Sequence, residues 1–299
     1  MKRYLALLLA MIMMLGMFAG CGGEKTDAPA PDNSGTSTPA PAPTPETPAD
    51  PLTGVAYAED TTYDYLYASE ITSMNYLTTS VSQNQKSLAN FVDTLIEFDS
   101  YGNIVPCLAT EWSVSDDGLT WTFHLREGQK WYDYQGNEMG DVTAEDYVAA
   151  IRYVCDATME CDNSYLVEGW VVNAAEYWEY TYAQMVAVAK GQEVIDPENG
   201  NSEYAVDDAG VIYEIVYNDD ETAVTGYEEV LKVLPEDVMC EAIDDYTVVY
   251  HLESPRPYFL TAMGFGCYWP APAAMLETWG ASFGTDNTTI LYCGAFLCT

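Results

Sequence analysis

The first 54 residues of this chain are unsuited to building a hydrophobic core, which limits the fold to the residues that follow. Residues 1–3 carry two positive charges, and an apolar run occupies residues 4–17. A basic start, a short apolar run and small residues before a cleavage point are typical of a secretory signal peptide. The run is shorter than the roughly 20 apolar residues that cross a bilayer as a helix. We therefore predict that residues 1–20 are a signal peptide; an N-terminal anchor helix is the alternative.

The end of this segment predicts a lipid anchor. Cys21 directly follows Phe18, Ala19 and Gly20. A cysteine after Ala-Gly resembles the bacterial lipobox, whose cysteine becomes the lipid-modified first residue of the mature protein, although Phe18 stands where leucine is usual. The resemblance implies lipidation of Cys21 and a location at the cell membrane, on its extracytoplasmic face.

Residues 21–54 read as a tether. Residues 22–54 contain eight prolines, and no aliphatic side chain larger than alanine occurs there before Leu52. Such a segment buries too little apolar surface to offset the entropy lost on ordering. Its Ala-Pro and Thr-Pro repeats favour extended polyproline II structure. The folded part is therefore expected in residues 55–299, which form one large domain or two modest ones.

Charge and aromatic content narrow the function classes. Removal of residues 1–20 takes away Lys2 and Arg3 and leaves 8 basic against 47 acidic residues, a net charge of −39. Nucleic acids and anionic lipid surfaces need a basic footprint, so we expect no nucleic-acid partner. The 24 tyrosines and 7 tryptophans indicate a packed core rather than a disordered chain.

Cysteine and histidine usage does not indicate a metal site. Seven cysteines remain after Cys21, an odd number that cannot pair completely within the chain. No C-x-x-C motif occurs, and the only histidines, His124 and His251, each lie near the end of a strand-like alternation. We therefore predict no zinc site and no cofactor.

The periodicity of apolar residues predicts a mixed α/β fold. Thr143 and Asp146 form a capping-box pattern before a helix that places Tyr147, Val148 and Ile151 inward. Further helices are predicted over residues 85–98, 174–190 and 271–279, strands over 119–125, 211–217 and 246–252, and an exposed loop over 196–210.

Three blocks of sequence resemble one family. Residues 106–148 contain Trp112, the run SDDGLTWTFHLREG and the TAED cap; residues 244–259 contain DDY, HL and PRPYF; residues 271–297 contain APAA, WG and GAFL. These blocks resemble the family 5 extracellular solute-binding proteins, the oligopeptide-, dipeptide- and nickel-binding lipoproteins of ABC importers. The matched residues mainly form turns, caps and core positions, so the resemblance concerns the fold more directly than the ligand.

The resemblance implies a two-lobed α/β fold of the type II, peptide-binding class, with only its N-terminal part present. It also implies a non-enzymatic protein that binds an oligopeptide, partners ABC permease subunits and is a monomer when complete. Because the chain stops soon after the third block, we expect the second lobe to be missing and isolated chains to bind oligopeptides weakly or undetectably. Tyr268, Trp269, Phe296 and Leu297 would then be the exposed apolar group.

The same resemblance implies where a ligand would lie. The loop before residue 84 falls where family members line the cleft with backbone groups, an aromatic residue approaches the ligand from the segment after residue 162, and two aromatics lie near the crossover between lobes. The candidate ligand-binding residues are Ser80, Val81, Ser82, Gln83, Tyr165, Tyr268 and Trp269.

Two other functions stay open from the sequence. One is a surface sensor or interaction lipoprotein without a transport role. The other is a hydrolase, because Gly280, Ser282 and Gly284 match the G-x-S-x-G pattern. That nucleophile elbow requires a strand before it and a histidine after it, and neither is predicted here.

The lipid-anchor hypothesis makes a direct prediction. Cys21→Ser should abolish labelling by a lipid precursor and release the protein from membranes, because the lipid chains would be the anchor after cleavage. Membrane fractionation checks this. Full membrane retention of the variant with residues 1–20 intact would instead support an anchor helix.

Overall fold

The computed structural model describes residues 66, 69–192 and 202–299, which belong to one compact unit, Asp64–Thr299. The predicted signal peptide (1–20), Cys21 and the tether (21–54) lie outside the described residues. Within the part that the structure describes, no helix is long and apolar enough to cross a membrane.

The central element is a four-stranded antiparallel sheet in the order β11 (Cys240–Asp244), β12 (Thr247–His251), β4 (Thr120–Leu125) and β3 (Ala109–Val114). Along β4 the side chains of Trp121, Phe123 and Leu125 are buried, whereas His124 is exposed. This alternation places one face of the strand in the core, as the sequence predicts.

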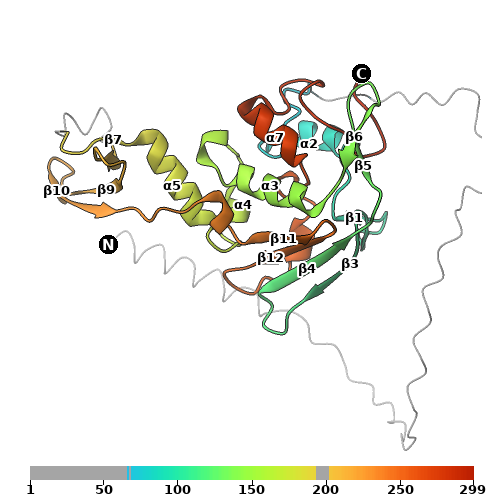
Figure 1. The fold of residues 1–299 in the computed structure, drawn as a ribbon, viewed down its shortest axis with the longest axis horizontal. Coiled ribbons are helices and arrows are strands. Elements are labelled where there is room, and N and C mark those ends of the chain that lie inside the picture. Colours follow the sequence, from blue (N-terminus) through green and yellow to red (C-terminus); the bar gives the residue numbers. More distant parts are fainter. Residues whose placement is uncertain (1–65, 67–68, 193–201) are drawn as a thin grey trace, which may run out of the picture. The chain divides into compact units, whose positions relative to one another are not determined.

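Helix α3 (Ala144–Val154) packs against β11 and β12 of this sheet (Figure 1). Thr143 caps the helix in extended conformation, and a capping box with Asp146 is present, which confirms the prediction. Asp146 also reaches other elements, because its carboxylate accepts hydrogen bonds from Trp131 Nε1 at 2.9 Å and from Ala273 N–H at 2.8 Å. Trp131 lies in β5 (Lys130–Tyr132) and Ala273 begins α7 (Ala273–Trp279), so one carboxylate joins three elements.

A second sheet follows α5 (Ala174–Val186) (Figure 1). Its order is β10 (Val224–Glu229), β9 (Ile212–Tyr217), β8 (Tyr204–Val206) and β7 (Val188–Ala189), and the β7–β8 pair is parallel. The helix predicted over 174–190 begins correctly but ends at Val186, because the next residues pair with β8. The loop predicted over 196–210 is likewise partly wrong, since β8 lies within it.

The helix predicted over 85–98 is also partly wrong. Helix α2 (Ser82–Leu88) ends early, and β1 (Ile96–Phe98) pairs with β2 (Ile104–Pro106) in an antiparallel hairpin. The Asp99 carboxylate accepts the backbone N–H groups of Tyr101 and Asn103, which closes the turn between these strands. Local turn chemistry and strand pairing therefore override a helical spacing of apolar residues.

The remaining elements are short. They are β6 (Glu138–Asp141), which pairs with β5, helices α4 (Tyr165–Glu168) and α6 (Phe259–Ala262), and 3₁₀ turns at Ala157–Met159, Pro235–Asp237, Gly266–Tyr268 and Gly280–Ser282. The seven cysteines among the described residues are all free, and five of them are buried.

Trp121 should be a major contributor to stability. Its side chain is 8% exposed, and its ring centroid lies 5.6 Å from that of Phe259. We predict that Trp121→Ala lowers the free energy of unfolding by about 3–5 kcal/mol. The matched control is Val114→Ala on the neighbouring strand, at an exposed position paired with Trp121, where the cost should stay within about 0.5 kcal/mol. Equal costs in denaturant titrations would contradict the burial of Trp121.

Candidate functional site

Two segments far apart in sequence, residues 77–80 and 161–163, are joined by hydrogen bonds. Asp162 N–H donates to Thr78 O at 3.0 Å, and the Cys161 thiol donates to Leu77 O at 3.0 Å. In the other direction, Ser80 donates both its N–H (3.1 Å) and its hydroxyl (2.7 Å) to Asp162 Oδ2. Burial raises the pKa of the Cys161 thiol to about 11, so it stays a protonated donor at neutral pH. These contacts place the predicted Ser80–Gln83 region beside the segment that leads to Tyr165.

Side-chain amides hold residues 75–80 in shape. Asn75 Oδ1 accepts the N–H groups of Leu77 and Thr78, and Gln85 Nε2 donates to the carbonyls of Tyr76 and Thr79 at 2.9 and 2.8 Å. Fully buried Asn84 donates to Thr79 Oγ1 at 3.0 Å. The loop therefore has a defined conformation without belonging to a helix or strand.

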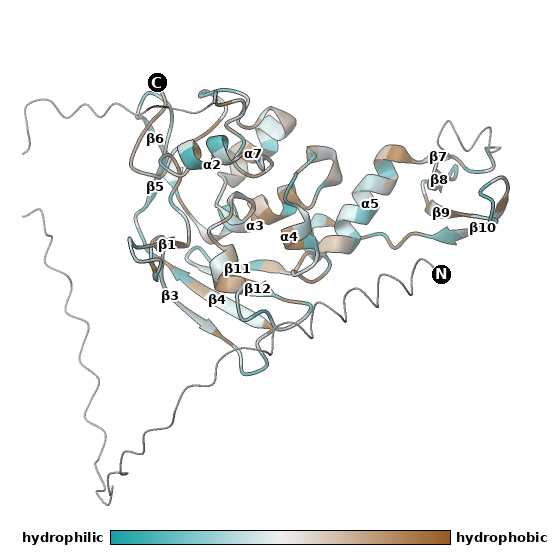
Figure 2. Ribbon diagram, turned by 180° about the vertical axis from the view of Figure 1, so that it is seen from behind, coloured by the Kyte–Doolittle hydropathy of each residue, from teal (hydrophilic) through white to brown (hydrophobic). Residues whose placement is uncertain are grey.

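Ser80, Val81, Ser82 and Gln83 are not all in a loop, contrary to the prediction. Ser80 and Val81 precede α2, whereas Ser82 and Gln83 form its first turn. Helix α2 is coloured as hydrophilic in Figure 2, in keeping with its sequence SQNQKSL. Ser80, Val81 and Ser82 are exposed, so three of the four predicted residues face solvent.

Tyr165 is the most exposed of the aromatic residues predicted to bind ligand. It begins helix α4, and 62% of its surface is exposed. The helix behind it is fixed at two points: Tyr268 Oη donates to Leu166 O at 2.8 Å, and Arg256 donates to Gly169 O at 3.0 Å. Tyr165 therefore projects an aromatic ring from a well-anchored helix.

Tyr268 and Trp269 are not surface residues. Tyr268 is 1% exposed and Trp269 is 4% exposed, so the expectation that they belong to an exposed apolar group is wrong. Their polar atoms are used internally, because Trp269 Nε1 donates to Gly264 O and its ring lies 5.7 Å from that of Tyr76. Tyr268 therefore contacts α4 through Leu166, and Trp269 packs against Tyr76 in the loop that leads to Ser80. Phe296 and Leu297 are exposed as expected.

A polar hollow of about 360 Å³ adjoins the joined segments. Its lining includes Thr78, which belongs to the segment 77–80, and Glu160, which directly precedes the segment 161–163. Glu160 has φ +51° and an exposed side chain. The hollow is lined by Thr72, Ser73, Asn75, Thr78, Tyr153, Thr158, Met159, Glu160, Ala281, Phe283, Gly284 and Thr285.

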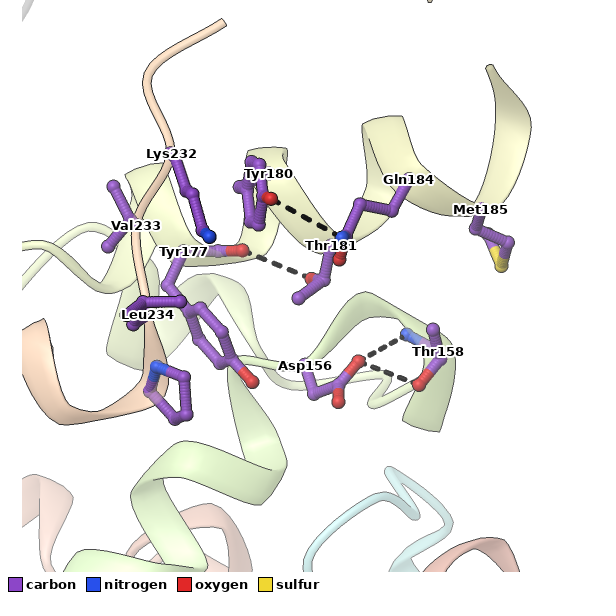
Figure 3. A pocket seen from close by; sticks show the side chains of 11 residues that line it. Asp156, Thr158, Tyr177, Tyr180, Thr181, Gln184, Met185, Lys232, Val233 and Leu234 are labelled. Atoms are coloured by element: carbon purple, nitrogen blue, oxygen red, sulfur yellow. Dashed lines mark hydrogen bonds between the residues drawn. The ribbon is translucent and has the colours of Figure 1, made fainter. Parts of the chain in front are cut away.

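A separate groove of about 480 Å³ lies between α5 and residues 232–235 (Figure 3). Some of its polar groups bond to one another: Asp156 accepts from Thr158, and the Thr181 hydroxyl donates to Tyr177 O. The groove contains none of the residues that the sequence predicts to bind ligand.

A metal site and a hydrolase site are the two alternative chemistries. Among the described residues, Asp93, Glu97 and Cys107 place one potential metal ligand each within 4.8 Å of one another. Burial, together with the nearby Asp93 and Glu97 carboxylates, raises the pKa of the Cys107 thiol to about 12, so the thiol is protonated in the metal-free protein. Ser282 lies in a 3₁₀ turn that follows helix α7 rather than a strand, so it does not form a nucleophile elbow.

Comparison with known proteins identifies the family. Residues 103–299 match the profile of the bacterial extracellular solute-binding proteins, family 5 Middle. The chain belongs to this family. It is 32% identical over 237 residues to the oligopeptide-binding protein AliB of Streptococcus pneumoniae and 30% identical over 240 residues to the oligopeptide-binding protein SarA of Streptococcus gordonii. These alignments cover 79% and 80% of this chain but 28% of each relative.

Two solved structures share the fold. The substrate-binding domain of an oligopeptide ABC transporter from Bacillus anthracis superposes with a TM-score of 0.54 at 21% identity, over 77% of this chain and 33% of that one. Listeria monocytogenes OppA bound to peptide gives 0.53 at 19% identity, over 75% and 33%. The predicted family and the type II peptide-binding fold are therefore confirmed. The family consists of binding proteins, which also confirms the prediction that this chain is not an enzyme.

A close backbone approach beneath the site gives a testable prediction. A Cβ at Gly266 would lie 2.2 Å from Tyr76 O and 2.5 Å from Gln85 Nε2. Gly266→Ala should therefore displace the 76–80 loop and cost about 1–3 kcal/mol by overpacking. Gly226→Ala is the control, because its Cβ would meet only Val216 Cβ at 3.8 Å. Thermal melts and amide exchange of residues 76–83 check this; equal behaviour of the two variants would contradict the packing described.

Proposed function

We propose that this chain is part of a lipid-anchored, extracytoplasmic substrate-binding component of an ABC importer, and that it binds oligopeptides at the surface formed by residues 78–83 and 160–165. We define these two segments as the peptide surface. The observation that carries the proposal is the Ser80–Asp162 connection, which fixes two solvent-facing segments next to each other in a family of solute-binding proteins.

The chemistry of the peptide surface suits an extended peptide. Peptides in extended conformation are held mainly through main-chain hydrogen bonds, with side chains placed in adjoining pockets. The Ser80 carbonyl offers a main-chain acceptor, Tyr165 offers an aromatic face, and the hollow beside Thr78 offers room for a side chain. The N–H groups of Ser80 and Val81 and the Val81 carbonyl already have partners within the chain. The relatives named as oligopeptide-binding proteins support the same ligand class.

The anchor and the partners follow from the proposal. A lipid on Cys21 with a proline-rich tether keeps a binding protein at the membrane, where permease subunits of an importer receive its ligand. The chain spans 28% of the length of its curated relatives, so the activity of a whole protein of this kind is part of the proposal.

Peptide titration followed by NMR tests the binding role. Because two short segments make the contacts, we expect dissociation constants of about millimolar for a mixed pentapeptide library, a free energy of about −4 kcal/mol. Backbone resonances of residues 78–83 and 160–165 should shift during the titration.

The Tyr165→Ala variant should weaken this binding several-fold, because the ring is the most exposed large hydrophobic side chain on the peptide surface. Tyr101→Ala is the matched control, since Tyr101 is 90% exposed in the β1–β2 turn, outside the proposed surface. Absence of shifts at millimolar peptide, or shifts confined to residues elsewhere, would refute the proposed function.

A further inference from the structure

We infer that the peptide surface selects cationic peptides, with Asp162 as the residue that discriminates by charge; this inference rests on the proposed function. The charged side chains of the two segments are all acidic. Residues 156–165 contain three acids, Asp156, Glu160 and Asp162, while residues 72–83 and 156–165 contain no lysine or arginine. A ligand that reaches this surface therefore meets carboxylates, and neither segment carries a cation of its own; the nearest lysine in sequence is Lys86, three residues beyond Gln83 in α2.

Asp162 is held in a position that leaves one oxygen available. Both hydrogen bonds from Ser80 go to Oδ2, and among the described residues none donates to Oδ1. Asp162 is exposed, and its backbone is fixed by the bond from its N–H to Thr78 O. A fixed carboxylate loses little conformational entropy when it pairs with a ligand cation, which favours a preorganised ion pair.

The charge of the rest of the chain acts in the same direction. The net formal charge is −37, so the surrounding field attracts cationic and repels anionic ligands beyond direct contact. This long-range part is screened over about 10 Å at 0.1 M salt, whereas a contact with Asp162 persists. Salt therefore separates the local contribution of Asp162 from the general field.

The experiment compares three pentapeptides, Ala-Ala-Lys-Ala-Ala, Ala-Ala-Gln-Ala-Ala and Ala-Ala-Glu-Ala-Ala, by NMR titration of the whole chain at 0.15 M salt. We expect the lysine peptide to bind about threefold more tightly than the glutamine peptide, the effect of one partly exposed ion pair. The glutamate peptide should bind most weakly.

Three variants identify the residue responsible. Asp162→Asn keeps the shape and an oxygen for Ser80 but removes the charge, so the preference for lysine over glutamine should vanish. Asp162→Glu keeps the charge and should retain the preference. Asp219→Asn removes the same charge from the exposed turn between β9 and β10 and should leave the preference unchanged.

The outcomes distinguish this inference from the proposed function. Equal binding of the three peptides, or a lysine preference that survives Asp162→Asn, overturns the inference while the peptide-binding role stands. No binding by any peptide overturns the proposed function and the inference with it.

Discussion

The fold depends on the buried carboxylate of Asp146. Its oxygens accept hydrogen bonds from the Thr143 N–H, the Trp131 indole and the Ala273 N–H, so the start of α3, strand β5 and the start of α7 share one acceptor. Burial raises the pKa of this carboxyl, and the three donors act in the opposite direction. Each donor left without an acceptor would cost about 1–3 kcal/mol, so the group sets how α3 and α7 lie relative to the sheet.

The candidate site is held by aromatic residues, a glycine and side-chain amides rather than by a buried carboxylate. Tyr268, in the turn before α7, hydrogen-bonds α4, and the neighbouring Gly266 lets the turn approach the Tyr76 backbone. Amide side chains of Asn75 and Gln85 then fix the loop that carries Ser80. Buried aromatic packing thus supports polar groups at the surface, which is how a binding surface can be both exposed and well ordered.

Much of the fold was predictable because local signals agree with tertiary structure. Thr143 and Asp146 form the capping box, and the alternation through Trp121 and Phe123 marks a strand with one buried face. The predictions failed where pairing decided the outcome. Ile96 sits at helical spacing from Val92 yet enters a hairpin, and Val188 leaves α5 to join a sheet whose partner strand lies 16 residues further on.

The site was predictable only in part. Ser80 and Tyr165 were predicted to bind ligand from the family resemblance, and the structure brings their segments together. Asp162 was not predicted from the sequence, because its contact with Ser80 spans 82 residues and no local pattern indicates it. Tyr268 and Trp269 were expected to be exposed, but the sequence alone does not show that their polar atoms find internal partners.

Photo-crosslinking tests the central claim most directly, because it locates a bound peptide on the chain. A pentapeptide carrying a photoreactive side chain, irradiated with the protein and mapped by mass spectrometry, should label residues within 78–83 and 160–165. Competition by an unlabelled peptide should remove this labelling. Competable labelling confined to the groove beside α5, or to any surface that excludes both segments, would contradict the account.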